Sequence, residues 1–147
     1  MYKRILIPID GSESAWKALD YASLLGEKFQ AELMVTHVEP YRGSAVPLAP
    51  ILRPDVERGE HEFLVAAKKR LENYPYGVTS KLELGHPAER ILSLAEDWSA
   101  DLIIIGRRGL SNIAGFLMGS VSNAVIQYAH IPVLVVKDKG EQKEFSD

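Results

Sequence analysis

The first apolar run of this chain is Arg4-Ile5-Leu6-Ile7-Pro8-Ile9-Asp10, and a turn signal, Gly11-Ser12, follows it directly. A short and nearly continuous apolar run is typical of a strand that is buried on both faces. Beyond the turn, apolar residues recur at the spacing of one helical face: Ala15, Ala18, Leu19, Ala22, Leu25 and Phe29. We therefore predict a central strand followed by a helix that covers the sheet.

The rest of the chain repeats this alternation of strand and helix. We predict further strands over residues 33–38, 78–84, 101–105 and 132–136. We predict helices from about Asp55 to Tyr74, from Pro87 to about Trp98, and through Val121, Ala124, Val125 and Tyr128. Such alternation implies parallel pairing through right-handed crossovers. The expected fold is α/β, a doubly wound five-stranded parallel sheet with helices on both faces and strand order 3-2-1-4-5, counted along the chain.

Length and composition limit the class of protein. The 147 residues, 46% of them apolar, suit one domain, which we place at residues 1–137 with a polar tail at 138–147. The longest apolar stretches are far shorter than the ~18 residues of a membrane-spanning helix, so we expect no membrane association. The absence of cysteine and of a secretory apolar region after Met1 fits a cytoplasmic location. A net charge of −3 without a dense basic stripe argues against nucleic-acid binding.

The most unusual segment follows the strand at 101–105 and contains glycines at 106, 109, 115 and 119 before Ser120-Val121-Ser122. A glycine loop that leads into a helix N-terminus can point several backbone N–H groups at an anion, of which phosphate is the obvious one. The hydroxyls of Ser120 and Ser122 would add donors. Alternatively, the glycines serve turns alone and Ser120 only caps the helix. The segment is neither a Walker A loop nor a Gly-x-Gly-x-x-Gly fingerprint, so the residues alone predict an anion site.

The spacing Gly106-x2-Gly109-x9-Gly119-Ser120 resembles the nucleotide-binding signature of the universal stress protein family. The similarity continues through residues 5–12, His37-Val38, Gly85-His86-Pro87 and residues 131–136. The resemblance implies a Rossmann-like fold of the adenine nucleotide alpha hydrolase type. Because family members with the full glycine pattern typically bind ATP, it also implies an ATP site, with Mg²⁺ arriving on the phosphates.

The resemblance also implies roles for individual residues. Asp10 would contact the ribose, the backbone of Val38 would read the adenine edge, and Pro8 and Ile9 would wall the adenine pocket. The phosphate side would comprise Gly106, Arg107, Gly109, Gly119, Ser120, Val121 and Ser122. Asp10 has an alternative role as a turn residue or helix cap, although Ser12 is the better candidate for the cap. Arg107 and Arg108 could neutralise phosphate charge or simply be solvated.

Three classes of function fit these residues. A nucleotide-responsive regulatory protein of the stress response explains the site best. A slow ATPase or phosphotransferase would need an activated nucleophile, and no catalytic constellation converges on the glycine loop in the sequence. The third class is a partner-binding module with an empty loop. We assign no metal site to the protein itself, because His37 suits a buried strand and His61, His86 and His130 lack ligand spacing.

The last predicted strand raises the question of assembly. Residues 132–137 would lie at a sheet edge, where an apolar strand is an aggregation hazard unless it is covered. We therefore expect a homodimer in which this strand pairs with its counterpart in a second copy, as relatives in the family commonly do. Alternatively, Pro132 and Lys137 protect the edge of a monomer.

Overall fold

The computed structural model describes residues 1–40, 61–107 and 118–138. Within these residues, strands and helices alternate along the chain. The elements are β1 (Arg4–Pro8), α1 (Glu13–Phe29), β2 (Glu32–Glu39), α3 (Glu62–Arg70), β3 (Val78–Leu84), α4 (Pro87–Trp98), β4 (Leu102–Gly106), α5 (Ser120–Tyr128) and β5 (Val133–Val136).

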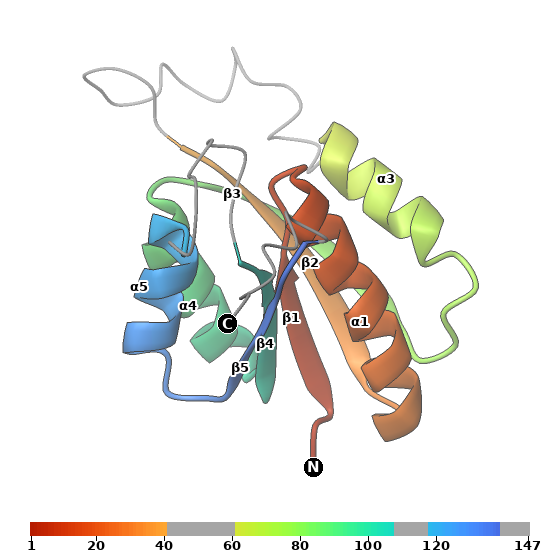
Figure 1. Cartoon of the computed structure of the whole chain (residues 1–147). Coiled ribbons are helices and arrows are strands. Elements are labelled where there is room, and N and C mark those ends of the chain that lie inside the picture. Colours follow the sequence, from red (N-terminus) through yellow and green to blue (C-terminus); the bar gives the residue numbers. More distant parts are fainter. Residues whose placement is uncertain (41–60, 108–117, 139–147) are drawn as a thin grey trace, which may run out of the picture.

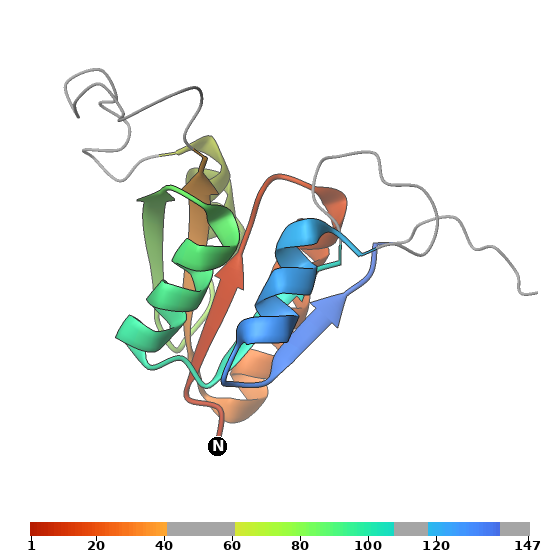
Figure 2. The same ribbon diagram turned by 90° about the vertical axis from the view of Figure 1, so that its left-hand side faces the viewer.

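All strand pairs in the sheet are parallel. The five strands lie in the order β3-β2-β1-β4-β5, which confirms the predicted fold class and strand order. Helices α1 and α3 cover one face, and α4 and α5 cover the other (Figure 1). Figure 2 shows α4 and α5 in front of the sheet. Strands β1 and β4 are neighbours in the sheet although they are distant in sequence, so the strand order reverses between them.

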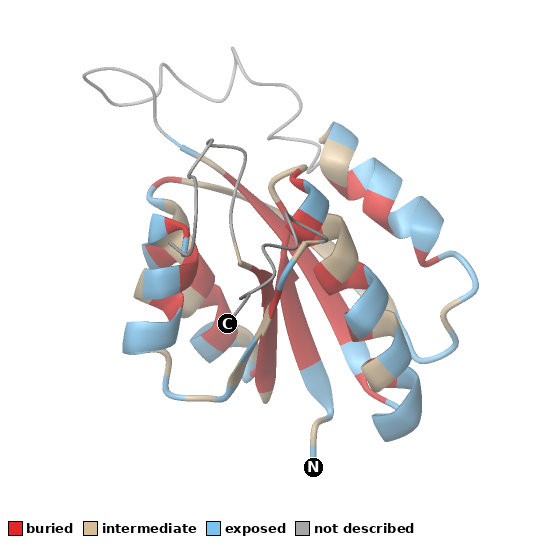
Figure 3. Cartoon of the chain, viewed as in Figure 1, coloured by how far each residue is buried: buried red, intermediate tan, exposed pale blue. Residues whose placement is uncertain are grey.

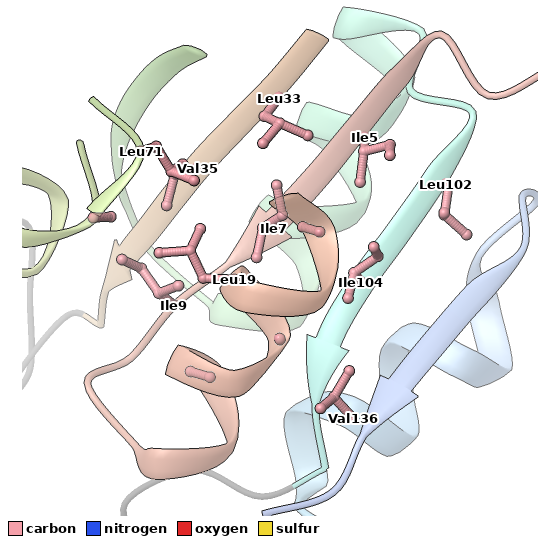
Figure 4. Packing of buried hydrophobic residues seen from close by; sticks show 14 of the residues in the cluster. Ile5, Ile7, Ile9, Leu19, Leu33, Val35, Leu71, Leu102, Ile104 and Val136 are labelled. Carbon is pink, nitrogen blue, oxygen red and sulfur yellow. The ribbon is translucent and has the colours of Figure 1, made fainter. Parts of the chain in front are cut away.

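The hydrophobic core has two halves, one on each side of the sheet. Alternate residues of the central strands point to opposite faces, so Ile5 and Ile7 pack under α1, whereas Leu6 packs toward α4 and α5. Figure 4 shows the first half of the core, in which Leu19 of α1 lies over Ile7. The buried residues concentrate in the strands and on the inner helix faces (Figure 3). Burial on both faces explains why β1 and β4 read as continuous apolar runs.

One predicted helix differs from the structure. The range of about Asp55 to Tyr74 is too long, because α3 begins at Glu62 and ends at Arg70. His61 has an extended backbone and its side chain caps the helix by accepting the N–H of Phe63. Leu71 and Tyr74 follow the end of the helix and still contact the core. Their apolar spacing therefore resembles that of a helix although they lie outside it. Residues 55–60 lie outside the described part of the chain.

The amino-terminal end of the sheet is held by hydrogen bonds between segments that are distant in sequence. A carboxylate oxygen of Asp101 accepts the N–H groups of Lys3 at 2.8 Å and Arg4 at 3.0 Å. The guanidinium of Arg4 donates to the carbonyl of Trp98 at 3.0 Å. These bonds connect the start of β1 to the turn before β4. Among residues 1–40, 61–107 and 118–138, no helix has both the length and the apolar composition needed to cross a membrane.

Candidate functional site

A cavity of about 250 Å³ lies at the carboxyl-terminal end of the sheet. Its walls come from the ends of β1, β2 and β4 and from the first turns of α1, α4 and α5. This position is where β1 and β4 adjoin and the strand order reverses. Doubly wound sheets bind their ligands at such a point, because the crossovers on either side leave toward opposite faces and open a crevice.

The cavity collects the predicted site residues from four separate segments of the chain. Those that line it are Pro8, Ile9, Asp10, Val38, Gly106, Gly119, Ser120, Val121 and Ser122. Arg107 is next to the lining without belonging to it. Gly109 and Arg108 lie outside the described residues, as do residues 41–54, which follow β2 in the sequence, and residues 139–147 of the tail.

One side of the cavity is largely apolar. Pro8 and Ile9 at the end of β1 and Val38 near the end of β2 are buried and face the space from the sheet. Ile91, on the inner face of α4, approaches from the helix side, and Pro87 is the first residue of that helix. A flat apolar heterocycle could be enclosed here, with the backbone of β2 available to bond its edge.

The opposite side of the cavity is polar and is made by the start of α5. Gly119 is the N-cap residue, so Ser120 is the first helical residue and does not cap the helix. The backbone N–H groups of Ser120, Val121 and Ser122 lack partners within the helix because they belong to its first turn. They stand at the positive end of the helix dipole, where an anion is stabilised.

Hydrogen bonds hold the start of α5 against the end of β4. The hydroxyl of Ser122 is buried and donates to the carbonyl of Gly106 at 2.6 Å. The N–H of Gly119 donates to the carbonyl of Arg107 at 3.0 Å, and the N–H of Arg107 donates to Val136 at 2.8 Å. The Ser122 hydroxyl proton is therefore committed to the protein, so this side chain positions the helix start.

Gly106 has a packing role in addition to its place in the cavity wall. A Cβ atom at this position would lie 2.5 Å from the Ser14 hydroxyl oxygen and 2.8 Å from the backbone nitrogen of Ala15. Both atoms belong to the first turn of α1. Glycine is needed here because the end of β4 and the start of α1 touch through their backbones.

Asp10 and Ser12 together shape the turn from β1 into α1. The carboxylate of Asp10 accepts the N–H of Ser12 at 2.9 Å, which is the turn role that the sequence left open. Ser12 is the N-cap of α1, as predicted, and its hydroxyl accepts the N–H of Ala15 at 3.3 Å. Gly11 between them has a φ of +84°, a conformation that suits glycine. This geometry holds the Asp10 carboxylate at the cavity wall.

A cluster of two imidazoles and one carboxylate adjoins the cavity. His37, itself part of the lining, approaches Glu39 at 3.1 Å, and His61 approaches the same carboxylate oxygen at 2.8 Å. Burial alone would raise the pKa of Glu39, but hydrogen bonds and electrostatic interactions with His37 and His61 lower it below its ordinary value. Glu39 is therefore a carboxylate at neutral pH.

Several lining residues were missed by sequence reasoning. They include Ala15, His37, Pro40, Pro87, Ile91 and Ile105. The available signal was position, since Pro40 directly follows a strand and Ile105 directly precedes Gly106. The contact of His61 with Glu39 carried no sequence signal, because the two residues belong to different elements.

Residues 1–137 match the universal stress protein family. This chain belongs to that family. It is 35% identical over 145 residues to the universal stress protein MJ0531 of Methanocaldococcus jannaschii, covering 93% of this chain and 83% of that protein. Among solved structures, protein MJ0577 of the same organism superposes with a TM-score of 0.82 at 35% identity, covering 95% of this chain and 98% of the other.

A second solved relative carries information on ligands. It is a universal stress protein in complex with cAMP, with a TM-score of 0.70 and 28% identity, covering 93% of this chain and 98% of the other. The family assignment and the cavity at the carboxyl-terminal end of the sheet are independent observations.

Proposed function

We propose that this universal stress protein is a cytoplasmic regulatory protein that binds an adenine nucleotide, ATP together with Mg²⁺, in the cavity at the end of its sheet. The observation that carries the proposal is the convergence of Asp10, Val38 and the first turn of α5 on one cavity. The cAMP complex of a relative supports the adenine nucleotide class. The nucleotide-bound and nucleotide-free states of such a protein would differ in their affinity for a partner.

The difference between the two sides of the cavity supports one orientation of the proposed nucleotide. The adenine would lie between Pro8, Ile9 and Val38, and the ribose would reach Asp10 at the cavity wall. The phosphates would face Gly119 and the N–H groups at the start of α5. Gly109 and the guanidinium of Arg107 would complete the phosphate side, and Mg²⁺ would be held mainly by phosphate and water oxygens.

The first test is binding. Small molecules released from freshly purified, denatured protein should include an adenine nucleotide when analysed by mass spectrometry. In the stripped protein, ATP with Mg²⁺ at one hundred times its dissociation constant should add about 2.7 kcal/mol to the free energy of unfolding. AMP and cAMP, measured alongside, separate a triphosphate site from a monophosphate site.

The critical variant is Gly119→Val. The φ of Gly119 is −61°, which residues other than glycine also adopt, so the fold should survive the substitution. The valine side chain should obstruct the phosphate side of the cavity. The control is Asn123→Val, an exposed position of the same helix outside the cavity lining. We expect the nucleotide-dependent stabilisation to vanish in Gly119→Val and to persist in the control. An undiminished effect of ATP on Gly119→Val would refute the proposed site.

A turnover assay on the same stripped protein distinguishes a regulatory protein from an enzyme. A regulatory protein needs no turnover, so ADP release should be slow or absent. Sustained turnover near the ~10 s⁻¹ typical of enzymes, abolished by Gly119→Val, would instead establish an ATPase or phosphotransferase.

We also propose that the protein is a homodimer built on β5. Within the described part of the chain, this strand is at the sheet edge and pairs with β4 alone. Leu134 is 37% exposed, and Val133 and Val135 are half-buried. Antiparallel pairing with β5 of a second copy would satisfy the free backbone edge and cover these side chains through a two-fold contact.

Sedimentation equilibrium tests the dimer. The wild type should have about twice the 16.3 kDa mass of one chain at micromolar concentration, and Val135→Lys should be a monomer. The control is Ile126→Lys, which adds the same charge at an exposed position of α5. A wild-type monomer would refute the dimer, and a dimer that tolerates Val135→Lys would place the interface elsewhere.

A further inference from the structure

The cluster of His37, Glu39 and His61 holds the donor set of a metal site. Its three potential ligand atoms, one from each side chain, all lie within 4.8 Å of one another. His37 and Glu39 come from the end of β2, and His61 is the cap residue of α3. Two imidazoles and one carboxylate are the three protein ligands of some four-coordinate zinc sites, in which water or a bound ligand takes the fourth position.

The hydrogen bonds of His37 show why a cation suits this place. Its Nδ1 lies 2.8 Å from the carbonyl of Ile9, and a carbonyl can only accept, so Nδ1 carries the proton of the neutral ring. The lone pair of Nε2 then faces the Glu39 carboxylate oxygen at 3.1 Å. Two acceptors cannot bond to each other, so the geometry requires a proton or a metal ion between them.

We propose that His37, Glu39 and His61 form a binding site for Zn²⁺ or a similar divalent transition-metal ion. The bound ion would connect the end of β2 to the start of α3. In zinc sites the bonds to nitrogen are ~2.0 Å, which places tetrahedral donors about 3.3 Å apart. The two short contacts in the cluster, 2.8 and 3.1 Å, are already close to this separation.

The surroundings of the cluster fit a metal centre. The bond from His37 to the Ile9 carbonyl fixes the tautomer and the ring orientation, as outer-sphere partners of metal-bound histidines do. The ring of Phe63 is edge-on to the ring of His37, with 5.1 Å between the ring centroids, and its centroid is 4.8 Å from that of His61. This aromatic wall shields one side of the site, and the side chains of the three ligands are between 8% and 18% exposed.

Coordination by His61 would exchange one interaction for another. Its Nδ1 accepts the N–H of Phe63 at 3.1 Å, so the neutral ring carries its proton on Nε2. Binding of a metal at Nε2 moves that proton to Nδ1 and ends the capping bond. The exchange favours the metal, because a capping bond is one neutral hydrogen bond at a helix end that water can replace, whereas an ion joins three ligands at once.

The choice of metal follows from the donors. Imidazole nitrogen suits Zn²⁺ and its transition-metal neighbours, whereas Mg²⁺ prefers oxygen ligands and keeps its water. The proposed site is therefore distinct from the place of a Mg²⁺ ion on nucleotide phosphates. It uses none of the groups that would contact a phosphate.

The test uses the full chain without an affinity tag, stripped with EDTA and free of nucleotide. Titration with Zn²⁺ should give one ion per chain, a raised midpoint of thermal unfolding, and a calorimetric signal that millimolar Mg²⁺ does not abolish. Nitrogen NMR should show the His61 proton moving from Nε2 to Nδ1 when zinc binds. Co²⁺ in place of Zn²⁺ should give the visible absorption of a low-coordinate nitrogen and oxygen site.

The variants are His61→Asn and Glu39→Gln. Asparagine is itself a good N-cap, so loss of zinc in His61→Asn cannot be attributed to fraying of α3. We expect each variant to weaken zinc binding at least about a hundredfold, more than the loss of an outer-sphere partner causes. The matched control is His130→Ala, which removes a histidine that is 4.0 Å from Glu96 on the surface. It should bind zinc like the wild type.

Three outcomes would overturn the proposal. They are the absence of stoichiometric zinc, an affinity unchanged in both variants, and a loss of zinc binding in the His130→Ala control. A His37 ring that carries protons on both nitrogens in the presence of zinc would be a fourth such outcome, because it would assign the cluster to proton binding alone. Because nucleotide is absent throughout, failure here leaves the ATP proposal standing, and failure of ATP binding leaves the metal site standing.

Discussion

The polar groups at the two ends of the sheet have different surroundings. At the amino-terminal end, the chain satisfies its own polar groups, as when Asp101 accepts the N–H groups of Lys3 and Arg4. At the carboxyl-terminal end, the turns around the cavity present Asp10 and the first turn of α5 toward open space. The amino-terminal end therefore contributes mainly stability, whereas the carboxyl-terminal end combines stability with a place for a ligand.

This contrast makes a general expectation for mutations. Substitutions at the amino-terminal end should lower the free energy of unfolding by equal amounts with and without nucleotide. Substitutions at the carboxyl-terminal end should alter the stabilisation that nucleotide provides. Four changes, in order of decreasing expected effect, can break or sharpen the contrast.

The largest effect is expected for Gly106→Ala at the carboxyl-terminal end. The added Cβ would meet Ser14 and the backbone of Ala15 below 3 Å, so the start of α1 must move away from β4. We expect a loss of about 3 kcal/mol in the free energy of unfolding. Urea denaturation measures it, and the nucleotide-dependent stabilisation should fall as well because the cavity wall is displaced. A stable variant with full nucleotide binding would show that the contact of α1 with β4 yields easily.

The next effect is expected for Asp101→Ala at the amino-terminal end. The substitution leaves two backbone N–H groups without their carboxylate partner. We expect the free energy of unfolding to fall by about 2 kcal/mol, since both bonds have a charged acceptor. The control is Asp97→Ala, which removes the same charge from an exposed position of α4. If Asp101→Ala weakened nucleotide binding, the two ends of the sheet would be coupled and the contrast would fail.

A smaller effect is expected for Ser122→Ala. Its loss removes a buried hydrogen bond to the carbonyl of Gly106 and should cost about 1.5 kcal/mol. Because the hydroxyl proton is committed to Gly106, nucleotide binding should weaken without disappearing, in contrast with Gly119→Val. Complete loss of binding in calorimetry would mean that the hydroxyl contacts the ligand directly.

The smallest effect concerns Tyr74, whose hydroxyl donates to the carbonyl of Ala31 beside the start of β2. Burial raises the pKa of Tyr74 to about 12, with a further contribution from the negative charge of Glu27. A raised pKa means that the protonated phenol stabilises the fold fully below the unfolded pKa near 10, and that this stabilisation is lost as the pH rises through 12.

The side chain of Tyr74 is partly open to solvent, so after allowance for screening the loss should be about 1 kcal/mol or less. Chemical denaturation of the wild type and of Tyr74→Phe between pH 9 and about 12 measures it. The stability difference between the two proteins should shrink as the pH rises. A constant difference would show that the phenol titrates at its ordinary pKa.

The local patterns of apolar residues in the sequence determine much of the fold of this protein. The apolar runs of β1 and β4, the helical spacing after Ser12 and the alternation of elements sufficed to predict a doubly wound parallel sheet. They sufficed because a period of two or of 3.6 residues is a property of consecutive positions. The glycine pattern before α5 predicted the anion side of the candidate site, whereas the roles of Pro8, Ile9, Asp10 and Val38 were implied by the family resemblance.

Tertiary structure decided the features that depend on residues far apart in the chain. The same apolar spacing continues through Leu71 and Tyr74, and only packing shows that the helix has already ended at Arg70. The need for glycine at position 106 arises from the backbone of α1. The meeting of His61 with Glu39 arises because α3 docks beside the end of β2. Sequence periodicity reports which face of an element is buried, whereas the partner of a buried polar group depends on how the elements are placed in space.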